Sequence, residues 1–293
     1  MYFPYLIARG EEVEAIIATV CQFKDNKIIP VLEPYNEDED ELYKYNKLIK
    51  LVGSLIEANK SFVMLIDSEK DLQELKNSFK DLDDYCIHGY ESGNVNYQSD
   101  KQNIAIIHRN QDSLVDDSSN LIYNIFMPEV LRFQTYINQY NQGKSVLVED
   151  GFIKHEPNSD YPSHEDFNSE LCFTYKNKNV LGFGDFTILE NGYQPSGGGK
   201  ADSVTHVIHL TKKETASTKD KIVVYHYLTT PSEEADNKRR SAKTIAKAYN
   251  SRTQFLYTSG IKLIEGKYPN GTSLGMYKRI GVAHHIELIH SLI

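Results

Sequence analysis

The stretch Lys27-Ile28-Ile29-Pro30-Val31-Leu32-Glu33 indicates the class of fold that this chain adopts. It is a short apolar run that ends in an acid, and residues 38–59 after it carry apolar side chains at helical spacing. A second apolar run, residues 61–67, then ends in Asp67. Because these runs are apolar throughout rather than alternating, they are typical of strands that are buried on both faces. The pattern predicts strand, helix and strand in a parallel arrangement.

The same alternation extends outward over the first 150 residues. Further helices are expected over 11–23, 69–80 and 128–141, and further strands over 85–88, 103–108, 121–127 and 144–150. Parallel strands joined by right-handed crossovers suit either a (β/α) barrel or a doubly wound sheet. No Gly-x-Gly-x-x-Gly follows the early strands, so the dinucleotide-binding form loses support and we favour the barrel.

The second half of the chain departs from this rhythm. Strands are expected over 180–189, 203–211 and 221–228, and helices over 165–175, 232–250 and 274–292. The segment between the last two strands is too short and polar for a crossover helix, which predicts an antiparallel hairpin. We therefore predict an α/β fold, an irregular TIM-barrel-like (β/α) barrel closed partly by hairpin strands in the C-terminal half. It is expected to be a single domain over residues 1–293.

Composition narrows the functional classes. Of 293 residues 40% are hydrophobic and 25% are charged, which is normal for a soluble globular protein, and no apolar run approaches the roughly 18 residues of a membrane span. The net charge of −9 argues against tight binding of duplex DNA by the chain alone. The first residues lack the basic region of a secretory signal. Three widely spaced cysteines without a Cys-x-x-Cys pair fit reduced thiols in a cytoplasm.

Acidic residues end several of the predicted strands: Glu33, Asp67, Glu149 and Asp185. The carboxyl ends of barrel strands meet on one face, where the active sites of characterised barrels lie. Carboxylates gathered there could hold Mg²⁺ or Mn²⁺ for phosphoryl chemistry, because these hard cations prefer oxygen ligands. Ordinary acids that cap the next helix or face solvent are the alternative. We predict that Glu33 and Asp185 lie at the same end of the barrel.

The stretch Gly182-Phe183-Gly184-Asp185 places two glycines inside a strand. Such glycines indicate a close approach of backbone or a bulge that re-aims Asp185, with a tight barrel corner that cannot hold a Cβ atom as the alternative. The two interpretations are compatible, and we favour a functional Asp185.

Histidines and a glycine-rich loop supply further candidates. His209 and His226 are expected to point into the barrel from adjoining strands, as a general acid or as metal ligands, with buried structural histidines as the alternative. His285-Ile286-Glu287 is similar to the His-x-Glu of zinc deaminases, but no Pro-Cys-x-x-Cys accompanies it. Residues 196–200 lack the spacing of a Walker A motif, although Gly197, Gly198 and Lys200 could bind an anion. A hairpin tip is the more ordinary interpretation of that loop.

A basic stripe, Arg239, Lys243 and Lys247, recurs at helical spacing. It could meet phosphates, but we favour a solvated face that pairs with the acids of residues 233–236.

Several motifs taken together resemble one family. They are the Gly-Phe-Gly-Asp-Phe block at 182–186, Ser196-Gly197-Gly198, Ile208-His209-Leu210, His284-His285-Ile286-Glu287-Leu288, Tyr2-x-Pro4-Tyr5-Leu6 with Glu12, Pro30-x-x-Glu33-Pro34, and Asp160-Tyr161-Pro162 with Phe167. The chain is similar in these motifs to the beta protein family of phages and of bacterial mobile or defence-linked loci, over almost its whole length. The resemblance implies a barrel-like fold and no established reaction.

Two functions follow as hypotheses. The first is a component of a phage–host conflict system, in defence or counter-defence, whose polar strand-end pocket binds a ligand or a protein partner encoded nearby. The second is a metal-assisted phosphodiesterase or related hydrolase with Glu33, Glu149, Asp185 and His209 as catalytic groups and Asp67, His226 and His285 nearby. Carboxylates gathered at one face would favour the enzyme, whereas acids in ion pairs with Lys or Arg would favour the binding protein. We prefer the binding protein.

Overall fold

The computed structural model describes residues 1–8, 10–34, 41–65, 69–92, 103–111, 120–189, 204–216 and 219–293, with the side chains of residues 41–46 and 69–71 excepted. The chain divides into two compact units. Unit 1 comprises Met1–Asp150, Leu171–Asp185 and Ile293, and unit 2 comprises Gly151–Glu170 and Phe186–Leu292. Compactness alone does not make either unit an independent domain, so the expected single domain over residues 1–293 stays a prediction.

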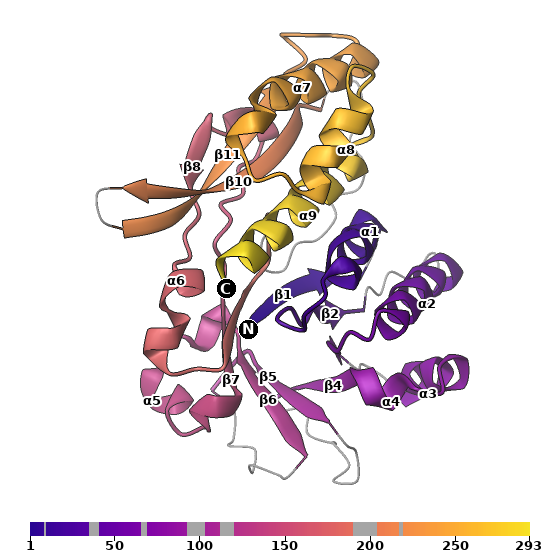
Figure 1. Cartoon of the computed structure of the whole chain (residues 1–293), viewed down its shortest axis with the longest axis vertical. Helices are drawn as coiled ribbons and strands as arrows, with labels where there is room; N and C mark the ends of the chain where they lie inside the picture. Colours follow the sequence, from indigo (N-terminus) through magenta and orange to yellow (C-terminus); the bar gives the residue numbers. More distant parts are fainter. Residues whose placement is uncertain are drawn as a thin grey trace. The chain divides into compact units, whose positions relative to one another are not determined.

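Unit 1 is built on a closed barrel of eight parallel strands (Figure 1). In spatial order the strands are β1 (Tyr2–Ile7), β2 (Val31–Glu33), β3 (Phe62–Leu65), β4 (Cys86–Glu91), β5 (Ile104–His108), β6 (Leu121–Phe126), β7 (Ser145–Glu149) and β9 (Gly182–Asp185). β9 pairs with β7 on one side and with β1 on the other, which closes the ring. The strands are short and almost wholly buried, as their apolar sequences require.

Helical segments connect the barrel strands. They are α1 (Gly10–Thr19), η1 (Val20–Gln22), α2 (Glu41–Glu57), α3 (Glu69–Ser78), α4 (Leu82–Tyr85), η2 (Pro128–Val130), α5 (Gln134–Ile137), η3 (Gln142–Lys144), α6 (Leu171–Thr174) and η5 (Tyr175–Lys178). The apolar stripe of α1 is fully buried at Val13 and Ile16, which is the usual source of stability for an amphipathic helix.

Unit 2 contains a separate three-stranded antiparallel sheet, in the order β10 (His206–Ala216), β11 (Lys219–Thr229) and β8 (His164–Asp166). Three helices, α7 (Asn237–Ser251), α8 (Ser259–Lys267) and α9 (Leu274–Leu292), pack with it (Figure 1), and short turns η4 (Asn158–Asp160) and η7 (Arg252–Gln254) complete the unit. Ile208 and Leu210 of β10 share a buried cluster with Ile245, Ile261 and Ile280 of the helices. One face of the sheet therefore forms the core of unit 2 with the helices.

The predicted parallel barrel and the predicted antiparallel hairpin are both confirmed, but the expected link between them is wrong. The hairpin of β10 and β11 belongs to the sheet of unit 2 and takes no part in closing the barrel. The N-terminal strand β1 closes it instead, by pairing with β2 and β9. No prediction was made for β1, because Tyr2–Ile7 is short and contains Pro4, a residue that weakens a strand assignment.

Two helix predictions also differ from the structure, and one helix was not predicted. The helix expected over 128–141 is broken into η2, α5 and η3, and the weak helix over 165–175 is replaced by β8 and α6. α8 was not predicted, although Thr258 caps it by accepting a hydrogen bond from the backbone of Ile261. Such short elements depend on tertiary packing more than on their own propensity.

Candidate functional site

The predicted strand-end acids lie at one end of the barrel. Glu33, Glu149 and Asp185 are the last residues of β2, β7 and β9, and all three strands run in the same direction. The prediction that Glu33 and Asp185 share an end is therefore confirmed. Asp67, the fourth acid, lies outside the described residues.

The side chains of these acids nevertheless lie on opposite faces of the barrel wall. The rings of Phe3 in β1 and Tyr123 in β6 are 5.1 Å apart although their strands are not neighbours, so Phe3 points into the barrel. Alternation along β1 then places Tyr5 inside and Tyr2 outside. Glu33 accepts a hydrogen bond from Tyr5, so its side chain lies on the inner side of the wall. Asp185 accepts one from Tyr2, so its side chain lies on the outer side.

Glu33 belongs to a cluster of charged and phenolic groups at the carboxyl ends of β1, β2, β4 and β5. We call this cluster the barrel mouth and define it as Tyr5, Glu33, Glu91 and Arg109. Arg109 Nε donates to Glu91 Oε1 at 2.6 Å, and Nη2 donates to Tyr5 Oη at 2.7 Å and to Glu33 Oε2 at 3.2 Å. Tyr5 Oη in turn donates to Glu33 Oε2 at 2.8 Å. The guanidinium thus links side chains from four strand ends.

The groups of the barrel mouth shift the pKa values of Arg109 and Tyr5. Burial disfavours the charged guanidinium of Arg109, but Tyr5, Glu91 and Glu33 together outweigh burial and raise the Arg109 pKa. Burial, followed by the nearby Glu33 carboxylate, raises the pKa of Tyr5 well above its ordinary value. Glu33 and Glu91 keep 38% and 41% of their side chains exposed, so the mouth presents acceptor oxygens to solvent.

Asp185 lies in a different environment. It is 2% exposed and accepts a hydrogen bond of 2.6 Å from Tyr2 Oη, which is itself fully buried. Burial, then the Asp185 carboxylate, raises the Tyr2 pKa well above its ordinary value. Glu149 pairs with Asp185 in register, so both acids share the outer side of the wall. A catalytic role for either acid stays a prediction.

The two glycines of β9 are explained by close packing inside the barrel. A Cβ atom on Gly182 would lie 2.7 Å from the carbonyl oxygen of Met1, and one on Gly184 would overlap the carbonyl oxygen of Phe3. β9 keeps an unbroken register with β7 and β1, so the predicted bulge that re-aims Asp185 is wrong. The predicted close approach of backbone, which leaves no room for a Cβ atom, is confirmed at both glycines.

His209 and His226 form a pair in unit 2. They face each other in register on β10 and β11, and their Nδ1 atoms lie 2.7 Å apart. The prediction that they project from adjoining strands is confirmed, but the expectation that they point into the barrel is wrong, because their strands belong to the other sheet. Ile208 and Leu210 face the helices, so the histidines lie on the opposite face of the sheet.

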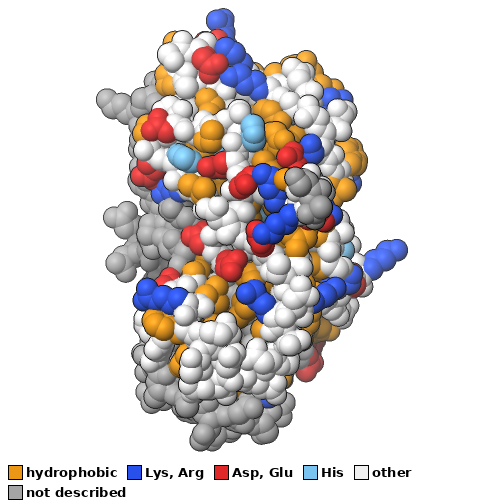
Figure 2. All heavy atoms as spheres, turned by 90° about the vertical axis from the view of Figure 1, so that its left-hand side faces the viewer, with side chains coloured by type: hydrophobic (Ala, Val, Ile, Leu, Met, Phe, Trp, Pro, Cys, Tyr) orange, Lys and Arg blue, Asp and Glu red, His pale blue; other side chains and the backbone are white. Residues whose placement is uncertain are grey.

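A polar and aromatic group surrounds the histidine pair. The Tyr161 ring stacks on His226 at 4.7 Å and meets His209 edge-on at 4.7 Å. Glu165 Oε1 lies 3.1 Å from His226 Nε2 without hydrogen-bond alignment, and His155 Nε2 lies 3.0 Å from Glu165 Oε2. The face of the molecule drawn in Figure 2 shows histidine and acidic side chains near one another at the surface, whereas His226 itself is buried.

Both histidines of the pair are held neutral. Burial first, and neighbouring histidines second, lower the pKa of His226 to about 3 and that of His209 well below 6.5. When both rings are neutral, one Nδ1 atom can donate and the other can accept the hydrogen bond across the 2.7 Å contact. A neutral His226 also remains beside an acid without forming an ion pair.

The other sequence candidates do not join either cluster. His285 lies in the buried part of α9, and its ring is 5.0 Å from that of Phe167. Gly197, Gly198 and Lys200 lie outside the described residues. Within the described ranges, no group of three or more His, Cys, Asp or Glu side chains is arranged to hold a metal ion. The three cysteines, all of which lie in the described part of the chain, form no disulfide bond.

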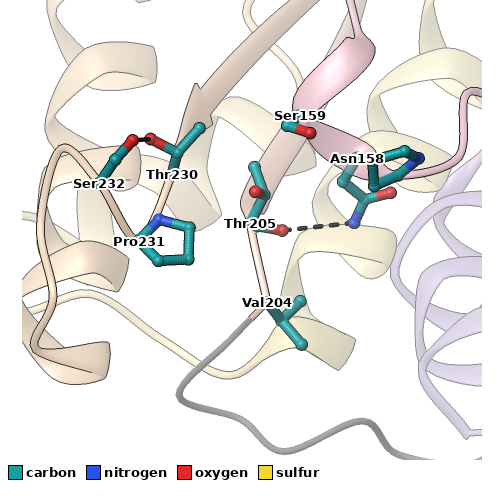
Figure 3. Close-up of a pocket in the computed structure, with 8 residues that line it drawn as sticks. Asn158, Ser159, Val204, Thr205, Thr230, Pro231 and Ser232 are labelled. Atoms are coloured by element: carbon teal, nitrogen blue, oxygen red, sulfur yellow. Dashed lines mark hydrogen bonds between the residues drawn. The ribbon is translucent and has the colours of Figure 1, made fainter.

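A pocket of about 560 Å³ lies in unit 2, between the start of β10, the end of β11 and η4. Its wall carries the hydroxyl groups of Ser159, Thr205, Thr230 and Ser232. Figure 3 shows Asn158 donating to the carbonyl of Thr205 and the paired hydroxyls of Thr230 and Ser232. Among the described residues, the lining consists of neutral polar groups, prolines and Val204, without a charged side chain.

Glu91 and Arg109 of the barrel mouth were missed by sequence reasoning. The strand predicted at 85–88 ends three residues too early, whereas β4 runs on to Glu91. Arg109 directly follows β5, but only acids were considered as strand-end candidates. Both residues could have been found by considering charged residues of either sign at the ends of the apolar runs.

Comparison of the chain with models of known protein families and with curated proteins gives no match. The resemblance to the beta protein family therefore stays a prediction. None of the helices in the described part of the chain is long and apolar enough to cross a membrane.

Proposed function

We propose that the protein is a binding component of a phage–host conflict system and that its barrel mouth recognises a protein partner. One observation carries the proposal: Arg109 joins Glu33 and Glu91 in ion pairs at the barrel end where such folds place their sites. Strand-end acids that form ion pairs with an arginine favour a binding protein, whereas carboxylates that converge on a vacant metal position would favour the enzyme. The conflict-system context rests on the family resemblance alone.

The charges of the barrel mouth define the chemistry of the partner. Two carboxylates face one guanidinium, so the mouth keeps an excess of negative charge and exposed acceptor oxygens. A lysine or arginine side chain of a partner would complement that excess, whereas a phosphate would be repelled by Glu33 and Glu91. The fixed position of Arg109, bonded to three neighbours, keeps both carboxylates preorganised.

A metal-assisted phosphodiesterase remains the alternative hypothesis, but no observation favours it. Glu33 faces the barrel interior and is paired with Arg109, while Glu149 and Asp185 lie on the outer side of the wall. Carboxylates on two sides of a barrel wall do not share one cation.

The test is a phage-protection or toxicity assay in cells, with the thermal stability of each purified variant measured alongside. Glu33→Gln with Glu91→Gln keeps the size of both side chains and removes the excess negative charge. The expected result is loss of the biological effect with a melting temperature close to that of the parent. Arginine amide, a mimic of the partner's side chain, should bind the parent weakly in a calorimetric titration and the double variant at least tenfold more weakly.

A matched control is Lys76→Ala, which breaks the partly exposed Lys76–Asp83 ion pair of the same unit. This change should leave both the biological effect and arginine amide binding unaltered, because surface pairs contribute little. If the double variant protects cells like the parent, the barrel mouth is not the recognition site. Dependence of the biological effect on added Mg²⁺ or Mn²⁺ would support the enzyme instead.

A further inference from the structure

Basic residues are concentrated in the last part of the chain. Residues 237–293 contain ten Lys or Arg and two Asp or Glu, whereas the whole chain contains 32 and 41. The helical part of unit 2 therefore has the opposite charge to the rest of the protein. Such asymmetry is a general sign of an anionic partner.

The basic stripe of α7 is already engaged. Lys247 Nζ contacts Glu233 Oε1 at 2.9 Å and the carbonyl of Leu228 at 2.6 Å, and Lys243 donates to the carbonyl of Glu233. The prediction that this stripe pairs with nearby acids is confirmed for Lys247, whereas Lys243 contacts only the backbone of Glu233. A site for an anionic partner must be sought elsewhere on the helices.

The C-terminal end of α7 carries a planar stack. The Arg252 guanidinium lies 3.8 Å above the ring of Tyr249, and the rings of Tyr249 and Tyr268 are 4.0 Å apart and almost parallel at 5°. Two planar groups this close to one ring cannot occupy the same side, so the order is Arg252, Tyr249, Tyr268. Tyr268 ends the stack and is 41% exposed.

A second exposed ring lies beside the stack. Tyr257 is 62% exposed, and Lys262 Nζ lies 5.6 Å from its ring centre. Glu265 accepts a hydrogen bond from Tyr257 Oη at 3.0 Å and another from Arg252 Nε at 2.9 Å. Glu265 therefore fixes the exposed ring relative to the stack, which lowers the entropy cost of binding on it.

We propose that this surface, made of Arg252, Tyr257, Lys262, Lys267 and Tyr268, binds single-stranded nucleic acid. Planar exposed rings stack with bases of any sequence, and Lys262 and Lys267 of α8 supply phosphate contacts, whereas Arg252 is held by Glu265 and supports the stack. Single strands are favoured over duplexes because only unpaired bases can reach a tyrosine ring. The opposite charge of residues 237–293 and of the remaining chain directs an anionic strand to this surface.

The experiment is a fluorescence anisotropy titration of the protein with an oligothymidylate of about 20 nucleotides, which exceeds the roughly 4–16 nucleotides that single-strand binding sites cover. Micromolar affinity is expected at low salt, with a logarithmic salt slope of about −1.4 for two phosphate contacts. Tyr257→Ala with Tyr268→Ala should weaken binding by roughly 5- to 150-fold per stacked base. Tyr257→Phe should weaken binding much less than the loss of the ring does, because the ring remains and only its hydrogen bond to Glu265 is removed.

Two matched controls accompany these variants. Lys262→Ala should weaken binding and reduce the salt slope, whereas Lys219→Ala removes an exposed lysine of the β10–β11 hairpin and should change neither. Tyr85→Ala removes a tyrosine of unit 1 and should also be silent. Circular dichroism confirms that each variant is folded.

Three results would overturn the proposal: no binding of the oligonucleotide at low salt, equal affinity for a duplex of the same length, or unchanged binding by the double tyrosine variant. If the tyrosine changes abolish binding of a protein while the parent binds no oligonucleotide, the surface is a protein interface. The barrel mouth variants Glu33→Gln and Glu91→Gln should not affect this titration, so failure here is distinct from failure of the function proposed for the mouth.

Discussion

Tyr2 Oη donates a hydrogen bond of 2.6 Å to Asp185 Oδ1 on the outer side of the barrel wall, across the seam where the first strand meets the last. Both residues are buried, so the contact is shielded from solvent. It joins two strands that are more than 170 residues apart in the chain and are adjacent only because the barrel closes.

Loss of the Tyr2 hydroxyl should therefore destabilise the barrel. Tyr2→Phe removes one hydrogen-bond donor from the buried Asp185 carboxylate, and we expect a loss of about 1–3 kcal/mol in the free energy of unfolding. Urea denaturation followed by circular dichroism measures it. Tyr85→Phe, whose hydroxyl contacts the exposed side chain of Asn59, is the control and should cost less than about 0.5 kcal/mol. Equal stability of the two variants would show that the contact at the seam contributes nothing.

Gly184→Ala should be destabilising by about 1–3 kcal/mol or should prevent folding, because the added methyl group overlaps the carbonyl oxygen of Phe3. Backbone atoms at a barrel seam cannot move aside as the end of a flexible side chain can. Gly266→Ala is a matched control in α8, where no atom lies within 4 Å of the added Cβ, and it should be neutral or stabilising. Thermal melting of both variants compares them directly, and a parent-like melting temperature for Gly184→Ala would contradict the close packing.

Unit 2 should lose stability in mild acid. The pKa of His226 is about 3 and that of His284 about 4 in the folded protein, and the His209 pKa is also far below 6.5. Below pH 6.5 the unfolded chain binds protons that the folded chain excludes. The contribution of the three histidines is therefore complete above pH 6.5 and declines as the pH falls towards about 3.

Each of these groups should cost up to about 1.4 kcal/mol per pH unit within that window. Urea denaturation at pH 7.5 and pH 5 tests the prediction while most carboxylates stay ionised, with His209→Gln and His226→Gln combined as the comparison. The double variant should show a shallower decline than the parent. A free energy of unfolding that is the same at both pH values in the parent would contradict it.

The amino-acid sequence alone determined the parallel part of the fold. Continuous apolar runs such as Val146–Val148 are typical of strands buried on both faces in a parallel sheet, and the short polar stretch after Thr211 predicts a hairpin. Strand-end acids such as Glu33 and Asp185 could be placed at one end of a barrel, because parallel strands share a direction. The local pattern of apolar and polar residues is enough to predict the direction of the strands and the end of the barrel at which these acids lie.

Only the tertiary structure decided which strands close the ring and which side of the wall each acid faces. β1 gains its partners from β2 and β9, which no local pattern of six residues records. A shift of one residue in a strand moves every side chain to the other face, so the inward Glu33 and the outward Asp185 could not be distinguished before the register was known. The histidine pair likewise needed the β10–β11 register to bring its two Nδ1 atoms within 2.7 Å. Burial, charge partners and proximity are properties of the packed chain, and residues as distant in sequence as Tyr5 and Arg109 acquire them only when it folds.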